Sequence, residues 1–281
     1  MNNSFKINFE QLRQDNLKEL FGILEEVLKA INIDYYVIGA LAKDSWFAKE
    51  DIRSRTTKDF DIAVMISDRD QYFELRDKLI HDHDFVEVKT NDYALNTPFD
   101  YPIDILPFGD IEIDDEVHLK GEGLTAIRVN GFNEVYRKGI IPVQTDEEFE
   151  FQVATLPSLV LLKLIAYDDR PEQRFRDITD ITNIITHFFD IESNMIYDKH
   201  NDLFEYADLD LIDYSAIVIG REISSIIKGN DKLKERLLNI LKLDKHHSKL
   251  IPDLMAGVKE LGLTVEKATT LLNEISDGIK E

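Results

Sequence analysis

The chain has 281 residues, of which 43% are hydrophobic, so it is globular in composition and long enough for two domains. No apolar run approaches the roughly 20 residues of a membrane span and no signal peptide begins the chain, so we expect a soluble cytoplasmic protein. The absence of cysteine excludes disulfides, a thiol nucleophile and cysteine-ligated zinc, and a formal charge of -22 argues against a broad nucleic-acid surface.

The chain opens with an amphipathic helix and a strand that ends at a glycine. Apolar residues recur at helical spacing from about Asn16 onward. Residues 35–40 then predict a strand that breaks at Gly39 and passes into a helix over 41–49. Because such a turn lets backbone N–H groups approach a phosphate, Gly39 and Ala40 are candidate phosphate contacts.

Two aspartates stand at the start of the next apolar strand. Asp59 and Asp61 lie at i and i+2 within residues 57–66, and alternate side chains of a strand share a face. Like charges held side by side call for a positive charge between them, usually a divalent cation. Ordinary surface aspartates are the alternative. The glycine turn before this pair and a third aspartate after it favour a metal site.

That third aspartate, Asp104, lies in a second apolar strand over residues 102–108, with isoleucine on both sides. A charged residue in such a place is seldom an ordinary surface residue. The turn-rich segment before this strand predicts a hairpin that delivers it to the sheet. Residues 111–114 and 126–129 alternate in polarity and predict further strands of the same sheet.

Between the two aspartate strands, the sequence predicts one helix and one edge strand. Ser67 is the expected N-cap of a helix that reaches about Ile80, with an acid three residues after the cap. Tyr72, Leu75 and Leu79 would form its buried face. Residues 85–88 predict the edge strand.

A helix that is apolar on nearly every side is predicted over residues 154–166, begun by Thr155 and Pro157. Lys163 lies inside it, and a buried ammonium must reach either solvent or an anion. The next predicted helix, 175–189, carries Asp177 and Asp180 at i and i+3. A simple salt bridge from Lys163 to one of these acids is one interpretation, and contact with a nucleotide phosphate is the other.

The rest of the chain predicts an acidic linker over residues 202–213 followed by helices. His246 and His247 lie beside Asp244, but without further spaced histidines they predict a solvated loop rather than a metal site. The helical patterns cover 215–228, 231–243, 251–262 and 264–280.

Five motifs follow one another between about Ile33 and Phe189. They are Ile38-Gly39-Ala40-Leu41-Ala42-Lys43-Asp44, Arg55-x-Thr57-x-Asp59-x-Asp61, Ile103-Asp104-Ile105-Leu106-Pro107-Phe108-Gly109, Leu162-Lys163-Leu164-Ile165-Ala166 and Arg176-Asp177-x-x-Asp180. In this order they resemble the nucleotidyltransferase superfamily of DNA polymerase β type, and within it the AbiEii/AbiGii toxin-like nucleotidyltransferases. Many members of the superfamily carry Gly-Gly or Gly-Ser where this chain has Gly39-Ala40. The backbone N–H of Ala40 would serve in place of a serine hydroxyl. The resemblance fades beyond Asp190.

The resemblance implies an α+β fold, with a mixed β-sheet, flanking helices and a helical C-terminal domain. Residues 1–150 would form the nucleotidyltransferase core with its N-terminal helix. Residues 151–200 would complete the nucleotide site, and residues 201–281 would form a helical subdomain.

The resemblance also implies a reaction and its cofactors. The protein would move an NMP from an NTP to a hydroxyl or phosphate of an acceptor, using two Mg²⁺ ions. Asp59, Asp61 and Asp104 would bind the metals, and Asp104 would act as base or orient the nucleophile. The residues expected to bind the nucleotide are Gly39, Ala40, Lys43, Arg55, Thr57, Lys163 and Asp177. Arg55 fits a salt bridge to a neighbouring acid equally well, and Asp177 would orient Lys163.

Charge restricts the acceptor and suggests a partner. A chain at -22 has few cations to spare, so the acceptor is expected to be a small molecule, a protein side chain or the end of an RNA such as tRNA. Arg55, Lys58 and the arginines of 170–176 would hold it. A basic antitoxin is the expected protein partner if the chain is a toxin. Two alternatives stay open, a catalytically silent nucleotide-binding module and an interaction protein that binds a basic partner.

Overall fold

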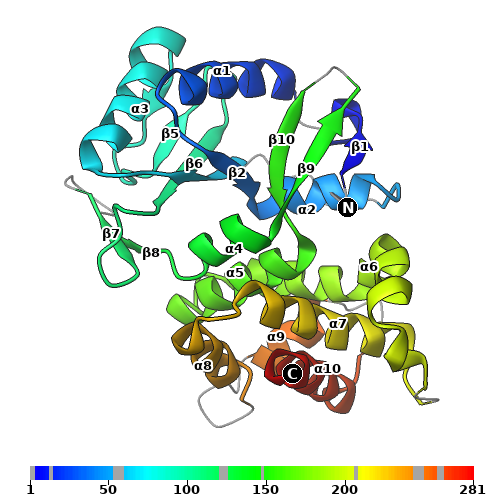
Figure 1. The fold of residues 1–281 in the computed structure, drawn as a ribbon. Helices are drawn as coiled ribbons and strands as arrows, with labels where there is room; N and C mark the ends of the chain where they lie inside the picture. The colour runs from blue at the N-terminus through cyan, green and yellow to red at the C-terminus, as the bar shows by residue number, and fades with distance from the viewer. Residues whose placement is uncertain are drawn as a thin grey trace. The chain divides into compact units, whose positions relative to one another are not determined.

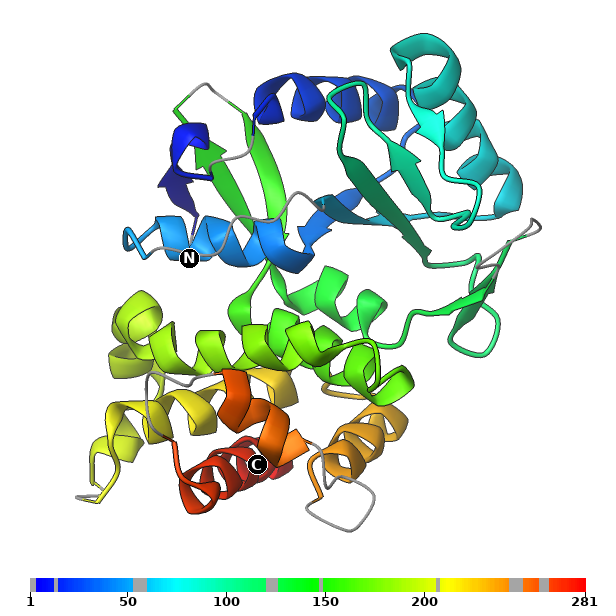
Figure 2. The same ribbon diagram turned by 180° about the vertical axis from the view of Figure 1, so that it is seen from behind.

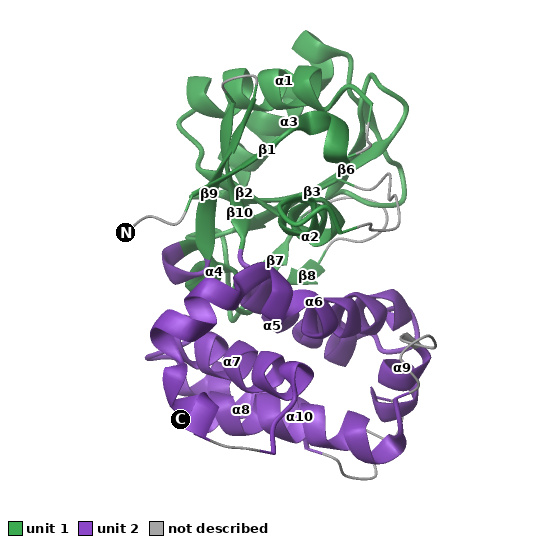
Figure 3. Ribbon diagram, turned by 90° about the vertical axis from the view of Figure 1, so that its right-hand side faces the viewer, with its two compact units in different colours: residues 1–136, 140–154 green, residues 137–139, 155–281 purple. Residues whose placement is uncertain are grey.

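The computed structural model describes residues 4–12, 15–52, 60–119, 126–146, 149–205, 208–242, 250–257 and 263–281. The chain divides into two compact units, which Figure 3 distinguishes by colour. Unit 1 comprises residues 1–136 and 140–154, and unit 2 comprises residues 137–139 and 155–281. Within the described parts of the chain, every helix is too short or too polar to cross a membrane.

Unit 1 is built on a mixed sheet, eight-stranded over the described residues, in the order β1-β9-β10-β2-β3-β6-β5-β4. Its centre joins β2 antiparallel to β3, and β3 parallel to β6. The described strands are β1 (Phe5–Ile7), β2 (Tyr35–Ile38), β3 (Phe60–Met65), β4 (Val86–Glu87), β5 (Ala94–Asn96), β6 (Pro102–Phe108), β9 (Ile140–Thr145) and β10 (Glu150–Ala154).

Helices cover both faces of this sheet. Figures 1 and 2 show α1 (Leu17–Ala30) and α3 (Arg69–His83) on one face and α2 (Gly39–Ala48) on the other. The ring of Phe21 in α1 lies 5.4 Å from that of Phe60 in β3. The hydroxyl of Tyr72 in α3 donates to the carbonyl of Ile105 in β6, at 2.9 Å. A 3-10 turn, η1 (Phe9–Leu12), and α4 (Phe132–Lys138) complete the helices of this part of the chain.

The α+β fold and the elements that carry the motifs are confirmed. The first helix, the strand that passes into a helix at Gly39, the strands of Asp61 and Asp104 and the hairpin of β5 and β6 form as predicted. Residues 57–59 of the first predicted aspartate strand lie outside the described residues. The predicted edge strand is β4, which ends the sheet. Three strands, β1, β9 and β10, were not predicted from the sequence, and Pro142 inside β9 weakens the strand signal there.

Two predictions for unit 1 are wrong. The N-cap of α3 is Asp68 and not Ser67, because the Asp68 backbone is extended and its carboxylate accepts the Gln71 N–H at 2.9 Å. Residues 111–114 and 126–129 do not extend the main sheet. β8 (Ala126–Arg128) pairs instead with β7 (Glu116–His118) in a separate two-stranded sheet, because alternating polarity predicts a strand without determining its partner.

Unit 2 is helical over its described residues. Thr155 caps the first of its helices as predicted, since its hydroxyl accepts the Ser158 N–H at 3.3 Å. The second helix runs ten residues past the predicted end at Phe189, with non-helical backbone at Glu192. The described helices are α5 (Leu156–Asp169), α6 (Phe175–Lys199), η2 (Asn201–Glu205), α7 (Leu211–Ile226), α8 (Asp231–Ile240), α9 (Leu250–Gly257) and α10 (Val265–Lys280).

The acidic segment before α7 is not a linker, which corrects the prediction. Leu203 is 3% exposed, and the Asp210 carboxylate caps α7 by accepting the N–H groups of Ile212 and Asp213. Asp210 therefore serves local structure within unit 2. His246 and His247, like residues 258–262 at the predicted end of α9, lie outside the described residues.

Two glycines bring α7 and α10 into backbone contact. A Cβ on Gly278 would lie 2.8 Å from the Arg221 nitrogen and closer still to the Ile217 carbonyl oxygen. A Cβ on Gly220 would meet the Gly278 Cα at 3.0 Å. The two helix backbones therefore approach more closely than any other residue type at these positions allows.

Candidate functional site

Two of the predicted metal ligands stand side by side in the sheet. Asp61 of β3 and Asp104 of β6 are register partners in a parallel pair, so their side chains point to the same face. Both are half-buried, while Phe60, Ile62, Ile103 and Ile105 beside them are fully buried. The structure thus brings together two carboxylates that are far apart in the sequence.

Gly39 closes one side of this pair. Its φ of 66° lies in the left-handed region, and its neighbour Ile38 is the register partner of Asp61. A Cβ built on Gly39 would lie 2.9 Å from the Asp61 Cγ and nearer still to Oδ2. Only glycine combines this backbone conformation with this close approach, so Gly39 is required for the observed position of the Asp61 carboxylate.

The N-terminus of α2 lies beside the Asp61 carboxylate. The helix begins at Gly39, and its N-cap, Ile38, makes no side-chain capping hydrogen bond. The first N–H groups of a helix lack intrahelical acceptors and carry partial positive charge, which suits them to phosphate oxygens. The predicted contacts at Gly39 and Ala40 are therefore well placed beside Asp61, and phosphate binding there stays a prediction.

Lys43 lies one turn further along α2 and is only 3% exposed. Its Nζ is 3.9 Å from an oxygen of Asp44 and 5.8 Å from the centroid of the Phe47 ring. The cation is therefore held within the protein near the start of the helix. Its contact with a nucleotide stays a prediction.

Four residues of the second motif, Arg55, Thr57, Lys58 and Asp59, lie outside the described residues. No group of three or more His, Cys, Asp or Glu side chains suited to a metal occurs in the described part of the chain. Asp61 and Asp104 nonetheless offer adjacent carboxylate oxygens, the donors that Mg²⁺ prefers. The described part of the site fits such an ion, and the role of Asp59 as a further ligand stays a prediction.

A second charged cluster lies in unit 2. The Lys163 ammonium, 9% exposed, donates to Asp177 Oδ1 at 2.9 Å and to Asp180 Oδ2 at 2.8 Å. Burial lowers the pKa of Lys163, but the charges of Asp177 and Asp180 outweigh it and raise the pKa to about 12. Lys163 therefore remains a cation at physiological pH and cannot act as a general base.

The ion-pair interpretation of Lys163 holds in a fuller form than expected, because both acids bind the ammonium. Asp180, which was predicted only as an alternative partner, is an equal member of the cluster, and its i, i+3 spacing from Asp177 was the signal for it. Arg174 Nη1 approaches Asp177 Oδ2 at 3.6 Å. The predicted contact of Lys163 with phosphate stays a prediction.

A mixed α+β sheet with two carboxylates on adjacent central strands, beside a helix that opens at a glycine, has the architecture of a nucleotidyltransferase. A family model described as "Nucleotidyl transferase AbiEii toxin, Type IV TA system" matches residues 48–260, and the chain belongs to this family. No curated protein and no solved structure matches the chain.

The matched range differs from the extent of the resemblance inferred from motifs. It begins after Gly39 and Lys43, and it continues past Asp190 through α7, α8 and α9. The inference that the resemblance fades beyond Asp190 is therefore wrong. The family match therefore includes α5 to α9 of unit 2, and α10 lies beyond it.

Proposed function

We propose that this protein is a metal-dependent nucleotidyltransferase that moves an NMP from an NTP to an acceptor. The observation that carries the proposal is the pairing of Asp61 with Asp104 on adjacent strands, directly beside the N-terminus of α2. In the reaction, an acceptor oxygen forms a bond to the α-phosphorus, the bond to the β-phosphate oxygen breaks, and pyrophosphate leaves. Membership of the AbiEii family supports the reaction class.

Each residue of the first three motifs has a proposed role in this reaction. Asp61 and Asp104, with Asp59, would hold two Mg²⁺ ions, whose charge would stabilise the phosphates and the developing negative charge. Asp104 would orient the nucleophile or accept its proton. The backbone N–H groups of Gly39 and Ala40 would donate to phosphate oxygens.

The cationic and polar residues of the motifs would complete nucleotide binding. Lys43, Arg55 and Thr57 would contact the nucleotide, as the resemblance implies. Lys163 would supply a permanent positive charge to phosphate, and Asp177 would orient its ammonium. Lys163 is already paired with Asp177 and Asp180, so a phosphate would have to share its ammonium with these acids.

We infer from charge that the acceptor contacts only a small surface. A protein at -22 repels a long polyanion, so the acceptor would be a small molecule, a protein side chain or the end of an RNA such as tRNA. A gel-shift titration with tRNA across salt concentrations tests this. Tight binding at physiological salt with a steep salt dependence would indicate an extended phosphate interface and contradict the proposal.

The family also supports a biological setting. As an AbiEii-type protein the chain would be the toxin of a type IV toxin–antitoxin system, with transfer to its acceptor as the toxic reaction. A cognate antitoxin with basic segments would suit its acidic surface. Growth arrest on expression of the wild type, relieved by the substitution described next, would support this setting.

The direct test is transfer of label from each of the four NTPs, with Mg²⁺, to total RNA or to purified protein. We expect Asp61→Asn to reduce transfer by at least about 10³-fold, because it removes a charge from the centre of the metal site. Asp77→Asn, at an exposed position of α3, is the matched control and should keep full activity. Mg²⁺ with NTP should also stabilise the wild type against heat more than Asp61→Asn.

Two outcomes would contradict the proposal. Near-normal transfer by Asp61→Asn would exclude the metal assignment. Saturable nucleotide binding without transfer to any acceptor would identify a catalytically silent nucleotide-binding module.

A further inference from the structure

Two aromatic rings lie stacked on the surface of unit 2. Tyr197, near the end of α6, and Phe204, in η2, have ring centroids 4.9 Å apart and planes 16° from parallel. Tyr197 is 54% exposed and Phe204 37%. The buried rings of Phe189 and Tyr214 contact this pair and complete a cluster of four rings, the aromatic platform.

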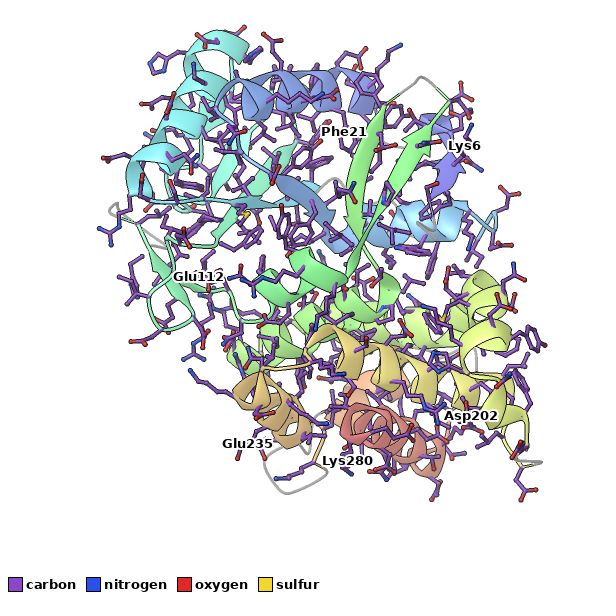
Figure 4. The ribbon with its side chains drawn as sticks, in the orientation of Figure 1. Lys6, Phe21, Glu112, Asp202, Glu235 and Lys280 are labelled. Carbon is purple, nitrogen blue, oxygen red and sulfur yellow. The ribbon has the colours of Figure 1, made fainter. Side chains whose placement is uncertain are left out.

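The platform is fixed in place by polar contacts of two residues that precede Phe204, His200 and Asp202. His200 is buried, and its Nε2 lies 3.1 Å from Glu222 Oε1 of α7. The Arg221 guanidinium donates to Asp202 at 2.9 Å, and Asp202 is labelled in Figure 4. Because these contacts tie η2 to α7, the exposed rings are ordered before any partner arrives, which lowers the entropic cost of binding.

The border of the platform is acidic. From Asp190 to Asp210 the sequence contains a single lysine, Lys199, and the acids Asp190, Glu192, Asp198, Asp202, Glu205, Asp208 and Asp210. Arg221 pairs with Asp202, and Lys267 pairs with Asp210. Asp198, Glu205 and Asp208 are exposed, and the first two directly follow the platform residues Tyr197 and Phe204 in the sequence.

We propose that the aromatic platform binds a basic segment of another protein, with an arginine side chain packed against the exposed surface of the stacked pair Tyr197 and Phe204. A guanidinium is planar, stacks on aromatic faces and donates several hydrogen bonds, so it matches both the rings and the carboxylates at their border. Nucleic acid, anionic lipid and a second copy of this chain all carry negative charge and are repelled by this border. The proposal does not depend on nucleotidyl transfer.

The first test measures binding of a fluorescent peptide in which arginine alternates with leucine. We expect Tyr197→Ala/Phe204→Ala to weaken binding by about tenfold or more, because it removes the stacking surface. Phe175→Ala, another exposed aromatic residue of α6, is the control and should bind like the wild type. Unchanged binding by the double variant, or an equal loss in the control, would overturn the proposal.

The second test separates this surface from general charge attraction. Asp198→Asn/Glu205→Gln/Asp208→Asn should weaken binding by about tenfold, whereas Glu74→Gln/Asp77→Asn/Asp82→Asn, which removes equal charge from α3, should change it less than about twofold. Equal losses of peptide binding in the two variants would show that net charge alone explains the binding, and would overturn the proposal.

A third measurement addresses the competing occupant. If Tyr197→Ala/Phe204→Ala converts a dimer of the protein alone to a monomer in sedimentation analysis, the platform is an interface between copies and the proposal is overturned. An unchanged oligomeric state, with the loss of peptide binding, supports it.

Discussion

The two clusters of charged side chains in this protein differ in the signs of the charges that they bring together. In unit 2, Lys163 lies between Asp177 and Asp180, so the cluster supplies its own counter-charge. In unit 1, Asp61 and Asp104 place like charges side by side, next to the start of α2. The comparison teaches that the chain itself supplies the opposite charge in the first arrangement, whereas in the second the proposed metal ions would add it.

After Asp61→Asn, the next largest effect is expected at Gly39, because a side chain at this position would displace the Asp61 carboxylate. Gly39→Ala introduces a Cβ that displaces the Asp61 carboxylate, so transfer should fall by about 100-fold or more. Gly229→Ala is the matched control, because Gly229 also has positive φ, at 100°, but nothing lies within 4 Å of its Cβ position. Both variants should lose about 1 kcal/mol of stability from backbone strain, and only Gly39→Ala should lose activity.

If Gly229→Ala lost transfer as severely as Gly39→Ala, the effect would be general destabilisation. The close approach of Gly39 to Asp61 would then have no special role.

The unit 2 cluster is tested by Lys163→Ala. Removal of the ammonium leaves two carboxylates without their shared partner, so the free energy of unfolding should fall by about 3 kcal/mol, measured by chemical denaturation. Lys280→Ala removes an exposed ion pair with Asp277 and should cost less than about 0.5 kcal/mol.

The nucleotide affinity of Lys163→Ala shows whether Lys163 has a role beyond stability. If Lys163 also contacts phosphate, affinity should fall by about 1.5 to 3 kcal/mol. A lower melting temperature with unchanged affinity would show that the cluster is purely structural and would remove Lys163 from the proposed site.

The contact between α7 and α10 is expected to be sensitive to a single methyl group. Gly278→Ala places a Cβ against the backbone of Ile217 and Arg221, so the helices must separate, at a cost of about 2 kcal/mol. Gly22→Ala, in α1, is the control, since nothing lies within 4 Å of its Cβ position. Thermal unfolding that is equally affected by both substitutions would refute close packing at Gly278.

The smallest effect is expected at Glu274 of α10, where burial and the charge of Asp213 raise the pKa to about 8. A carboxyl whose folded-state pKa is raised binds more protons in the folded than in the unfolded state between pH 4.5 and 8. Its contribution to stability is therefore present at low pH and lost as the pH rises through this window. Glu274→Gln should be more stable than the wild type at pH 9, by about 1 kcal/mol, and equal to it at about pH 4.

Glu235→Gln, at an exposed position of α8, is the control for this measurement and should follow the wild type at both pH values. An advantage of Glu274→Gln that is the same at low and high pH would reflect packing and not titration.

The sequence by itself determined most of the helices, the strands that carry Asp61 and Asp104, and the residue types of the site. Helical periodicity identified α1 and the helices of unit 2. An aspartate between two isoleucines identified β6 as a strand that carries a candidate functional residue. These signals are local, because they arise from which side of one element is buried. For the same reason they misplaced the cap at Ser67 by one residue and assigned residues 126–129 to the wrong sheet.

Only the tertiary structure decided which charged groups meet. The register of β3 with β6 puts Asp61 beside Asp104, the left-handed Gly39 lets the Asp61 carboxylate approach α2, and Lys163 binds both Asp177 and Asp180. The physical reason is that strand partners and helix contacts depend on burial summed over the whole unit. A sequence pattern shows which residues are charged or apolar, whereas long-range packing determines which residues they contact.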